Sequence, residues 1–120
     1  MIINFLIIIQ ANNNMDTVGI KVISQIEINR CIKILRKYCK LSIGEIKEAI
    51  ISNNYVVECS YVKEEGIVNI IKLYKELCDN NIQAQLYEHE RITNVEFLEN
   101  LVETYYEINE EIADRIWIKE

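Results

Sequence analysis

The spacing of the apolar residues changes repeatedly along this chain, and this feature constrains the fold more than any other. Every second residue is apolar through most of residues 18–24, 55–62 and 82–86, which is the pattern of a strand with one buried face. Apolar residues recur at intervals of three and four in residues 27–39 and 64–78, which is the pattern of an amphipathic helix. The sequence therefore predicts strands and helices that follow one another within a small domain.

Two further helices begin with the sequence signature of a capping box. Ser42 precedes Glu45 by three residues, and Thr93 precedes Glu96 by the same interval. In such a pair the hydroxyl accepts a hydrogen bond from the backbone N–H of the glutamate, and the carboxylate accepts one from the backbone N–H of the capping residue. The second helix is long, and Asn109 is a candidate break within it.

The order of these elements predicts an α+β fold, a β-α-α-β-α-β two-layer sandwich in which a three-stranded sheet carries its helices on one face. A C-terminal acidic helical extension follows. We expect residues 1–17 to be an apolar strand or a leader with a linker, and residues 18–88 to form the domain. Residues 89–120 are expected to be an acidic helical appendage packed on the domain or on a second protomer.

Residues 18–88 carry motifs with counterparts in a known family. Ile46-Lys47-Glu48-Ala49 is similar to the Leu-Lys-Glu-Ala signature of that family's second helix, and residues 71–86 resemble its last helix and strand. The family is the C-terminal domain of the bacterial ribosomal stalk protein, whose fold is shared by the adaptor that feeds substrates to the Clp protease. The resemblance implies a module that binds other proteins. The family's small-residue turn is replaced here by Asn80-Asn81, and the adaptor's acidic segment by Ser24-Gln25-Ile26-Glu27.

The negative charge is confined to the last third of the chain. Residues 88–120 hold ten acidic and three basic side chains, whereas residues 1–87 hold nine and ten, so the formal net charge of −6 belongs to the C-terminal part. This asymmetry indicates either a charged partner or solvated helix faces. General nucleic-acid binding is disfavoured, because it needs outward clusters of Lys and Arg. One basic cluster is interpreted as the solvated side of a helix pair: Arg30, Lys33, Arg36, Lys37, Lys40 and Lys47.

The cysteines and the single histidine indicate neither a metal nor a cofactor. Cys31, Cys39, Cys59 and Cys78 fall at apolar positions of periodic segments, so we interpret them as buried, reduced thiols of a cytoplasmic protein. His89 is the only histidine, which leaves no convincing Cys/His zinc set.

The N-terminus is an apolar run that is too short to cross a bilayer. Residues 1–9 lack the basic first region and the cleavage pattern of a signal peptide. The run is compatible with an extra strand, with a leader, or with sequence upstream of a start at Met15. In each case Asn12-Asn13-Asn14 is suited to a linker. No membrane association is expected.

No combination of residues indicates catalysis. Gly19, Gly44 and Gly66 are isolated, which excludes a glycine-rich phosphate loop. No serine has a glycine-flanked elbow, and His89 alone would have to serve any nucleophile. The sequence therefore predicts a protein without enzymatic activity.

The charge pattern favours a protein-binding function. A small acidic protein attracts a basic partner at long range, and desolvated contacts then give specificity. In type the chain resembles bacterial toxin-immunity proteins, which neutralise a cognate toxin by direct binding. The predicted partner contacts are Glu96, Glu99, Glu103, Glu107, Glu110 and Glu111, with Tyr105, Tyr106 and Trp117 as anchors. A solvated helix face is the competing interpretation of the same glutamates.

Two other functions remain open at the level of sequence. A narrow apolar seam in the C-terminal helix is suited to a homodimer of structural role. Its residues are Leu98, Leu101, Tyr105, Ile108 and Ile112. The alternative is an interaction module like the ribosomal stalk or the protease adaptor, which would contact a large assembly through the basic helix pair.

Overall fold

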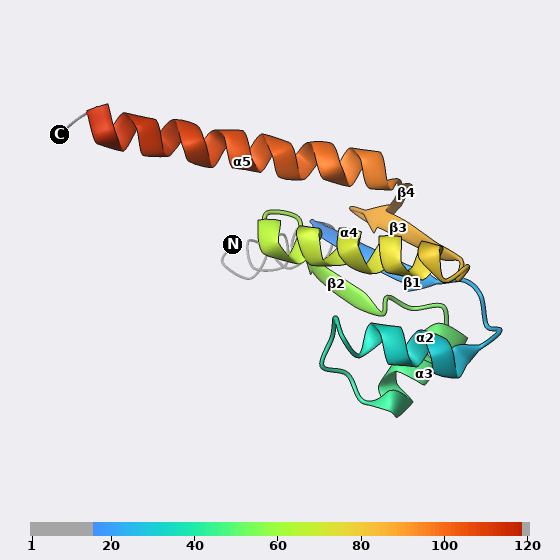
Figure 1. Ribbon diagram of the computed structural model, residues 1–120. Helices are drawn as coiled ribbons and strands as arrows, with labels where there is room; N and C mark the ends of the chain where they lie inside the picture. Colours follow the sequence, from blue (N-terminus) through green and yellow to red (C-terminus); the bar gives the residue numbers. More distant parts are fainter. Residues whose placement is uncertain (1–15, 119–120) are drawn as a thin grey trace, which may run out of the picture.

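A computed structural model describes residues 16–118 and the side chains of residues 16–108 (Figure 1). The elements are β1 (Thr17–Val22), α2 (Ile28–Leu35), α3 (Ile43–Ile51), β2 (Val57–Ser60), α4 (Glu64–Asp79), β3 (Ala84–Glu88), β4 (Arg91–Thr93) and α5 (Val95–Ile118). The predicted α+β class is confirmed. The strand or leader expected at the N-terminus lies outside the described residues.

The sheet has four antiparallel strands in the order β2-β1-β3-β4, so the predicted count of three is wrong. The additional strand, β4, pairs with β3 and places Thr93 opposite Leu86. It is reached through a two-residue turn at His89 and Glu90, whose φ angles of 50° and 63° match the tight hairpin turns that follow the twist of a sheet. β4 has three residues and its turn has neither glycine nor asparagine, so no strand or hairpin signal marked it in the sequence.

The central strand β1 presents its apolar residues to the helices. Val18, Ile20 and Val22 are at most 1% exposed, in agreement with the alternation in the sequence. Ile20 lies opposite Val57 of β2 on one side and Leu86 of β3 on the other. The strand is therefore hydrogen-bonded along both edges and buried on its helical face.

The alternation in residues 55–62 predicted that Tyr55 shares a face of the sheet with Val57, Cys59 and Tyr61. Tyr55 lies instead on the face that points away from the helices. A bend at Val56 interrupts the alternation before β2 begins. The Tyr55 ring covers Gly19, where an added Cβ would lie 2.5 Å from the ring. It meets the Tyr87 ring edge-on at 5.5 Å, and Lys21 Nζ lies 4.9 and 4.8 Å from the centroids of the two rings.

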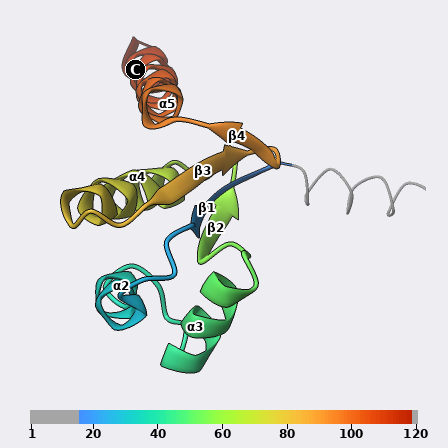
Figure 2. The same cartoon turned by 90° about the vertical axis from the view of Figure 1, so that its right-hand side faces the viewer.

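Helix α4 lies between the other helices. Figure 2 shows α5 on one side of α4 and the α2–α3 pair on the other. The apolar stripe predicted by the spacing in residues 64–78 consists of Ile67, Ile70, Ile71, Tyr74, Leu77 and Cys78. Ile67, Ile70 and Leu77 of this stripe are fully buried. Leu73 is also fully buried, although it lies outside that stripe. Leu73 lies on the same face of α4 as Asn69, four residues earlier. The Asn69 side-chain amide donates a hydrogen bond to the backbone carbonyl of Tyr38, which follows α2. The packing of the α2 segment against this face of α4 therefore explains the burial of Leu73.

The capping box predicted for α3 is confirmed. Ser42 Oγ accepts from the Glu45 backbone N–H at 3.1 Å, and Glu45 Oε1 accepts from the Ser42 backbone N–H at 3.0 Å. The hydrogen bond that the Glu45 carboxylate accepts from the Ser42 backbone N–H, followed by its interaction with the Ser42 hydroxyl, lowers the pKa of Glu45. Helix α2 ends at Leu35, earlier than the predicted end near residue 39, because the chain turns before α3.

A tyrosine–carboxylate pair joins the end of the α2 segment to α4, and its behaviour with pH can be predicted. Tyr38 Oη donates to Glu76 Oε1 at 2.6 Å, and Lys37 Nζ donates to the other oxygen of the same carboxylate. The hydrogen bond to Glu76, followed by burial and the carboxylate charge, raises the pKa of Tyr38 to about 12. Because the folded-state pKa lies above the ordinary tyrosine value of 10.0, this contribution to stability is complete below pH 10 and lost between pH 10 and 12.

We expect Tyr38→Phe to remove this part of the alkaline loss of stability. Urea unfolding of the wild type and the variant at a series of pH values should give a midpoint that declines less steeply above pH 10 in Tyr38→Phe. Tyr106→Phe, which removes an exposed tyrosine, is the control. Equal alkaline declines in Tyr38→Phe and the wild type would contradict the assignment.

Candidate protein-binding site

The long helix α5 begins one residue later than the capping-box pattern predicted. Asn94 Oδ1 accepts from the Phe97 backbone N–H at 2.8 Å and caps the helix. Thr93 does not cap it, because Thr93 pairs with Leu86 as the last residue of β4. The break predicted at Asn109 is also wrong, since α5 continues without interruption to its last residue.

The apolar seam of α5 packs against its own chain. Leu98 is fully buried in the core, and Leu101 and Tyr105 pack against the same core. Tyr105 Oη donates to the Tyr61 backbone carbonyl at 2.9 Å, and burial raises the pKa of Tyr105. Ile108 is 45% exposed and begins the part of the seam that the domain leaves uncovered. The Ile112 side chain lies outside the described side chains, and Leu98 is not accessible to a second protomer in this conformation.

Four glutamates form an acidic stripe along the outer side of α5. Glu96, Glu99, Glu103 and Glu107 are spaced by three or four residues and are all exposed, so they share one face of the helix. Lys75 Nζ of α4 lies 3.1 Å from Glu99 Oε2. The side chains of three other predicted contacts lie outside the described ones: Glu110, Glu111 and Trp117.

An apolar groove runs beside the acidic stripe, between α4 and α5. The groove encloses about 460 Å³. Its apolar lining is Val68, Ile71, Val102 and Tyr106, and its polar rim is Glu64, Lys72, Lys75, Glu99 and Glu103. Tyr106, a predicted anchor, is 61% exposed at the groove. The structure therefore brings together Glu99, Glu103 and Tyr106, and places Tyr105 in a structural contact instead.

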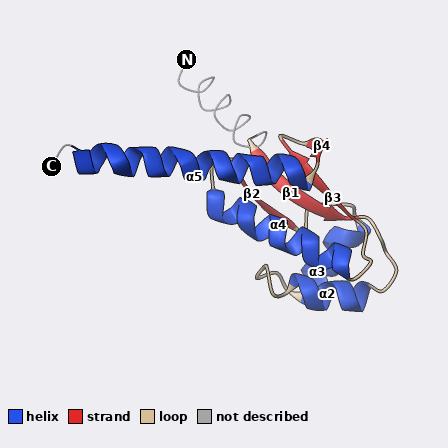
Figure 3. Cartoon of the chain, turned by 45° about the horizontal axis from the view of Figure 1, so that its top comes forward, coloured by secondary structure: helices blue, strands red, loops and turns tan. Residues whose placement is uncertain are grey.

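The α4 side of this groove was not predicted. Ile71 belonged to the predicted stripe of α4, but nothing in the sequence marked Val68, Lys72 or Lys75 as neighbours of α5. Figure 3 shows why they meet, because α5 runs back along α4 in the opposite direction and extends past its N-terminal end. No local sequence signal predicted this packing, because residues 80–94 between the two helices include two strands, β3 and β4.

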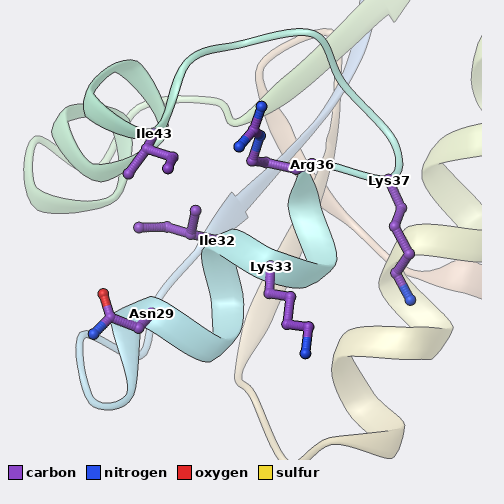
Figure 4. A pocket seen from close by; sticks show the side chains of 6 residues that line it. All are labelled: Asn29, Ile32, Lys33, Arg36, Lys37 and Ile43. Atoms are coloured by element: carbon purple, nitrogen blue, oxygen red, sulfur yellow. The ribbon is translucent and has the colours of Figure 1, made fainter.

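A second hollow, of opposite charge, lies between α2 and α3. It encloses about 600 Å³ and is lined by Asn29, Ile32, Lys33, Arg36, Lys37 and Ile43 (Figure 4). Three of these six side chains are cationic. Ile43 is 53% exposed at the rim, which leaves an apolar surface beside the cations. The basic helix face that the sequence indicated is therefore a pocket with an apolar component.

The interpretation of all four cysteines as buried thiols is wrong for Cys78, which is exposed; Cys31 is buried, and Cys39 and Cys59 are partly buried. Burial is the first cause that raises the pKa of Cys31 and of Cys59 to about 11, so both thiols are protonated and weakly nucleophilic at neutral pH. The His89 and Tyr61 rings are in contact, with their centroids 4.3 Å apart and their planes tilted by 35°, and His89 Nδ1 lies 3.3 Å from Asp16 Oδ1. Within the described part of the chain, no group of three or more His, Cys, Asp or Glu side chains is placed to hold a metal ion.

Among residues 16–118, no helix combines the length and the apolar character that a membrane span requires. In comparisons with protein-family models, curated proteins and solved structures, no match to this chain was found.

Proposed function

We propose that this protein is a non-enzymatic binding protein that captures a basic protein partner with α5 and the groove beside it. The acidic stripe and the exposed Tyr106 at the α4–α5 groove carry the proposal. The function that fits best is that of a small cytoplasmic immunity-type protein, which neutralises a toxin by covering the basic surface that the toxin needs for its activity.

The two parts of the site would contribute differently to binding. Exposed carboxylates accelerate encounter with a cationic surface and make it depend on salt, but each contributes little affinity once it is solvated. Affinity comes mainly from apolar and aromatic side chains that lose contact with water. Val102 and Tyr106 line the groove directly beside Glu99 and Glu103, so one partner segment can be attracted and desolvated at the same place.

The partner is expected to present a basic amphipathic helix. The groove between two antiparallel helices accepts an elongated segment, and its lining is apolar at the floor and charged at the rim. A helix with an apolar side chain in the groove and Lys or Arg residues one turn away would place those cations against Glu103 and Glu107. In Figure 1 the backbone of α5 continues beyond the N-terminal end of α4.

The test is the neutralisation of three stripe residues, Glu99→Gln, Glu103→Gln and Glu107→Gln together. The immobilised wild type is used to capture proteins from the cells that produce it, the captured protein is identified by mass spectrometry, and the purified pair is then titrated by calorimetry. We expect the triple variant to bind at least about tenfold more weakly, with a shallower dependence on salt. Tyr106→Ala should weaken binding by a similar factor and leave the salt dependence unchanged.

A matched control separates the site from the net charge. Glu48→Gln, Glu58→Gln and Glu90→Gln remove the same number of charges from exposed positions outside α5, and this variant should bind like the wild type. Equal affinity of the stripe variant and the wild type would exclude α5 as the binding surface. If the protein has an immunity function, the captured protein should be toxic when produced alone and not toxic when the wild type is produced with it. A captured protein that is not toxic when produced alone would overturn the immunity function.

A further inference from the structure

The α2–α3 pair carries cations that the fold leaves without partners. Arg30 is paired with Glu27, and Lys37 with Glu76. Within the described residues, the side chains of the other four cations on this surface make no hydrogen bond or ion pair. They are Lys33, Arg36, Lys40 and Lys47. Residues 28–51 thus hold six basic and two acidic side chains in a protein whose net charge is −6.

The hollow on this surface defines the chemistry of its occupant. Figure 4 shows Lys33 and Arg36 extending in different directions from the same helical segment as Ile32, and Ile43 lying on the side of Ile32 at the start of α3. An acidic segment would satisfy the cations, and an exposed apolar side chain on that segment would cover Ile43, which is 53% exposed. The pocket therefore fits an acidic amphipathic helix better than it fits a small anion.

The chain itself contains such a helix. Within the described side chains of α5, Glu103 and Glu107 are one turn apart. Tyr106 and Ile108, which are 61% and 45% exposed, lie on either side of these glutamates around the helix. From residue 95 to residue 108 there are four glutamates and no basic residue. Because α5 and the α2–α3 pair lie on opposite sides of α4, the acidic helix of one molecule is directed away from its own basic pocket (Figure 2).

We propose that the basic α2–α3 pocket is a docking site for the acidic helix α5 of a second copy of this chain. The contact joins two different surfaces, so it is head-to-tail, and it produces a growing chain of molecules unless the rotation closes a ring. It differs from the homodimer seam expected from the sequence, because it depends on the exposed Glu103 and Glu107 and not on the buried Leu98. A basic partner bound to α5 would compete with it, but the inference does not depend on that partner.

The experiment is sedimentation of the full chain at several concentrations and two ionic strengths. At about 0.01 M salt, where charges act over about 30 Å, the average mass should rise above 14.2 kDa as concentration increases. At about 1 M salt, where this range is about 3 Å, the protein should sediment as a monomer. A monomer at every concentration in low salt would overturn the proposal.

Two charge-reversal variants identify the surfaces. Lys33→Glu with Arg36→Glu alters the pocket, and Glu103→Lys with Glu107→Lys alters the helix. Each variant alone should be monomeric in low salt, whereas a mixture of the two should associate, because the intact helix of the first fits the intact pocket of the second. If the mixture stays monomeric while the wild type associates, the contact between pocket and helix is wrong.

The control has two charge reversals elsewhere, Lys21→Glu and Lys63→Glu, and should associate like the wild type. Circular dichroism and thermal unfolding verify that each variant is folded before sedimentation. Loss of association in this control would show that net charge, and not the pocket, governs self-association, and would also overturn the proposal.

Discussion

Replacing Leu98 with alanine is expected to lower the free energy of unfolding by about 2–5 kcal/mol, the usual range for a leucine buried in a core. Leu98 is fully buried, and it is the only α5 residue among the described side chains that reaches this degree of burial. The remaining contacts of the helix with the domain come from partly buried residues such as Leu101 and Tyr105. Removing Leu98 should therefore also loosen α5 from α4.

The measurement is urea unfolding of Leu98→Ala beside Ile108→Ala. Ile108 is on the same helix and 45% exposed, so its replacement should change the free energy of unfolding by no more than about 0.5 kcal/mol. Limited proteolysis should cut α5 faster in Leu98→Ala than in Ile108→Ala. Similar free energies of unfolding for the two variants would mean that α5 is not anchored at Leu98. The α4–α5 groove would then not be held in place by this contact.

Local sequence signals predicted the parts of the fold that depend on local physics. The capping box at Ser42 requires only two residues three positions apart, and both of its hydrogen bonds are present. The same pattern at Thr93 failed because a tertiary interaction took precedence. Thr93 is held in β4 by its pairing with Leu86, and Asn94 became the cap instead. A local motif cannot show that a neighbouring strand has already used one of its residues.

In the candidate site too, local spacing predicted some features, whereas others depend on tertiary packing. The exposure of Glu96, Glu103 and Glu107 follows from helical spacing, which the sequence contains. The groove requires Val68 of α4 to meet Val102 of α5, and this depends on how two separate helices pack. The apolar seam shows the same limit, since its spacing indicated a helix contact but not which helix would supply it.

Two identical substitutions at helical glycines should change stability in opposite directions. Gly44 and Gly66 both lie near the start of a helix, in α3 and α4 respectively. A Cβ at residue 44 would have no heavy atom within 4 Å, so Gly44→Ala gains helix propensity and should raise the free energy of unfolding by about 0.5–1 kcal/mol. A Cβ at residue 66 would lie 2.7 Å from Cys59 Cβ and 2.8 Å from its Sγ.

Gly66→Ala is therefore expected to lower the free energy of unfolding by about 1–3 kcal/mol, the usual cost of overpacking a well-packed region. Cys59 is on β2, so the added methyl group must push α4 away from the sheet, and the helix propensity gained is too small to offset this displacement. The Cys59→Gly background makes the test independent of the helix itself, because it removes both atoms that the methyl group would meet. If contact with Cys59 is the cause, Gly66→Ala should cost less in that background, as measured by a double-mutant cycle in urea. If Gly66→Ala lowers the free energy of unfolding equally in both backgrounds, contact with Cys59 is not the cause. If Gly66→Ala raises the free energy of unfolding, α4 and β2 are not packed this closely.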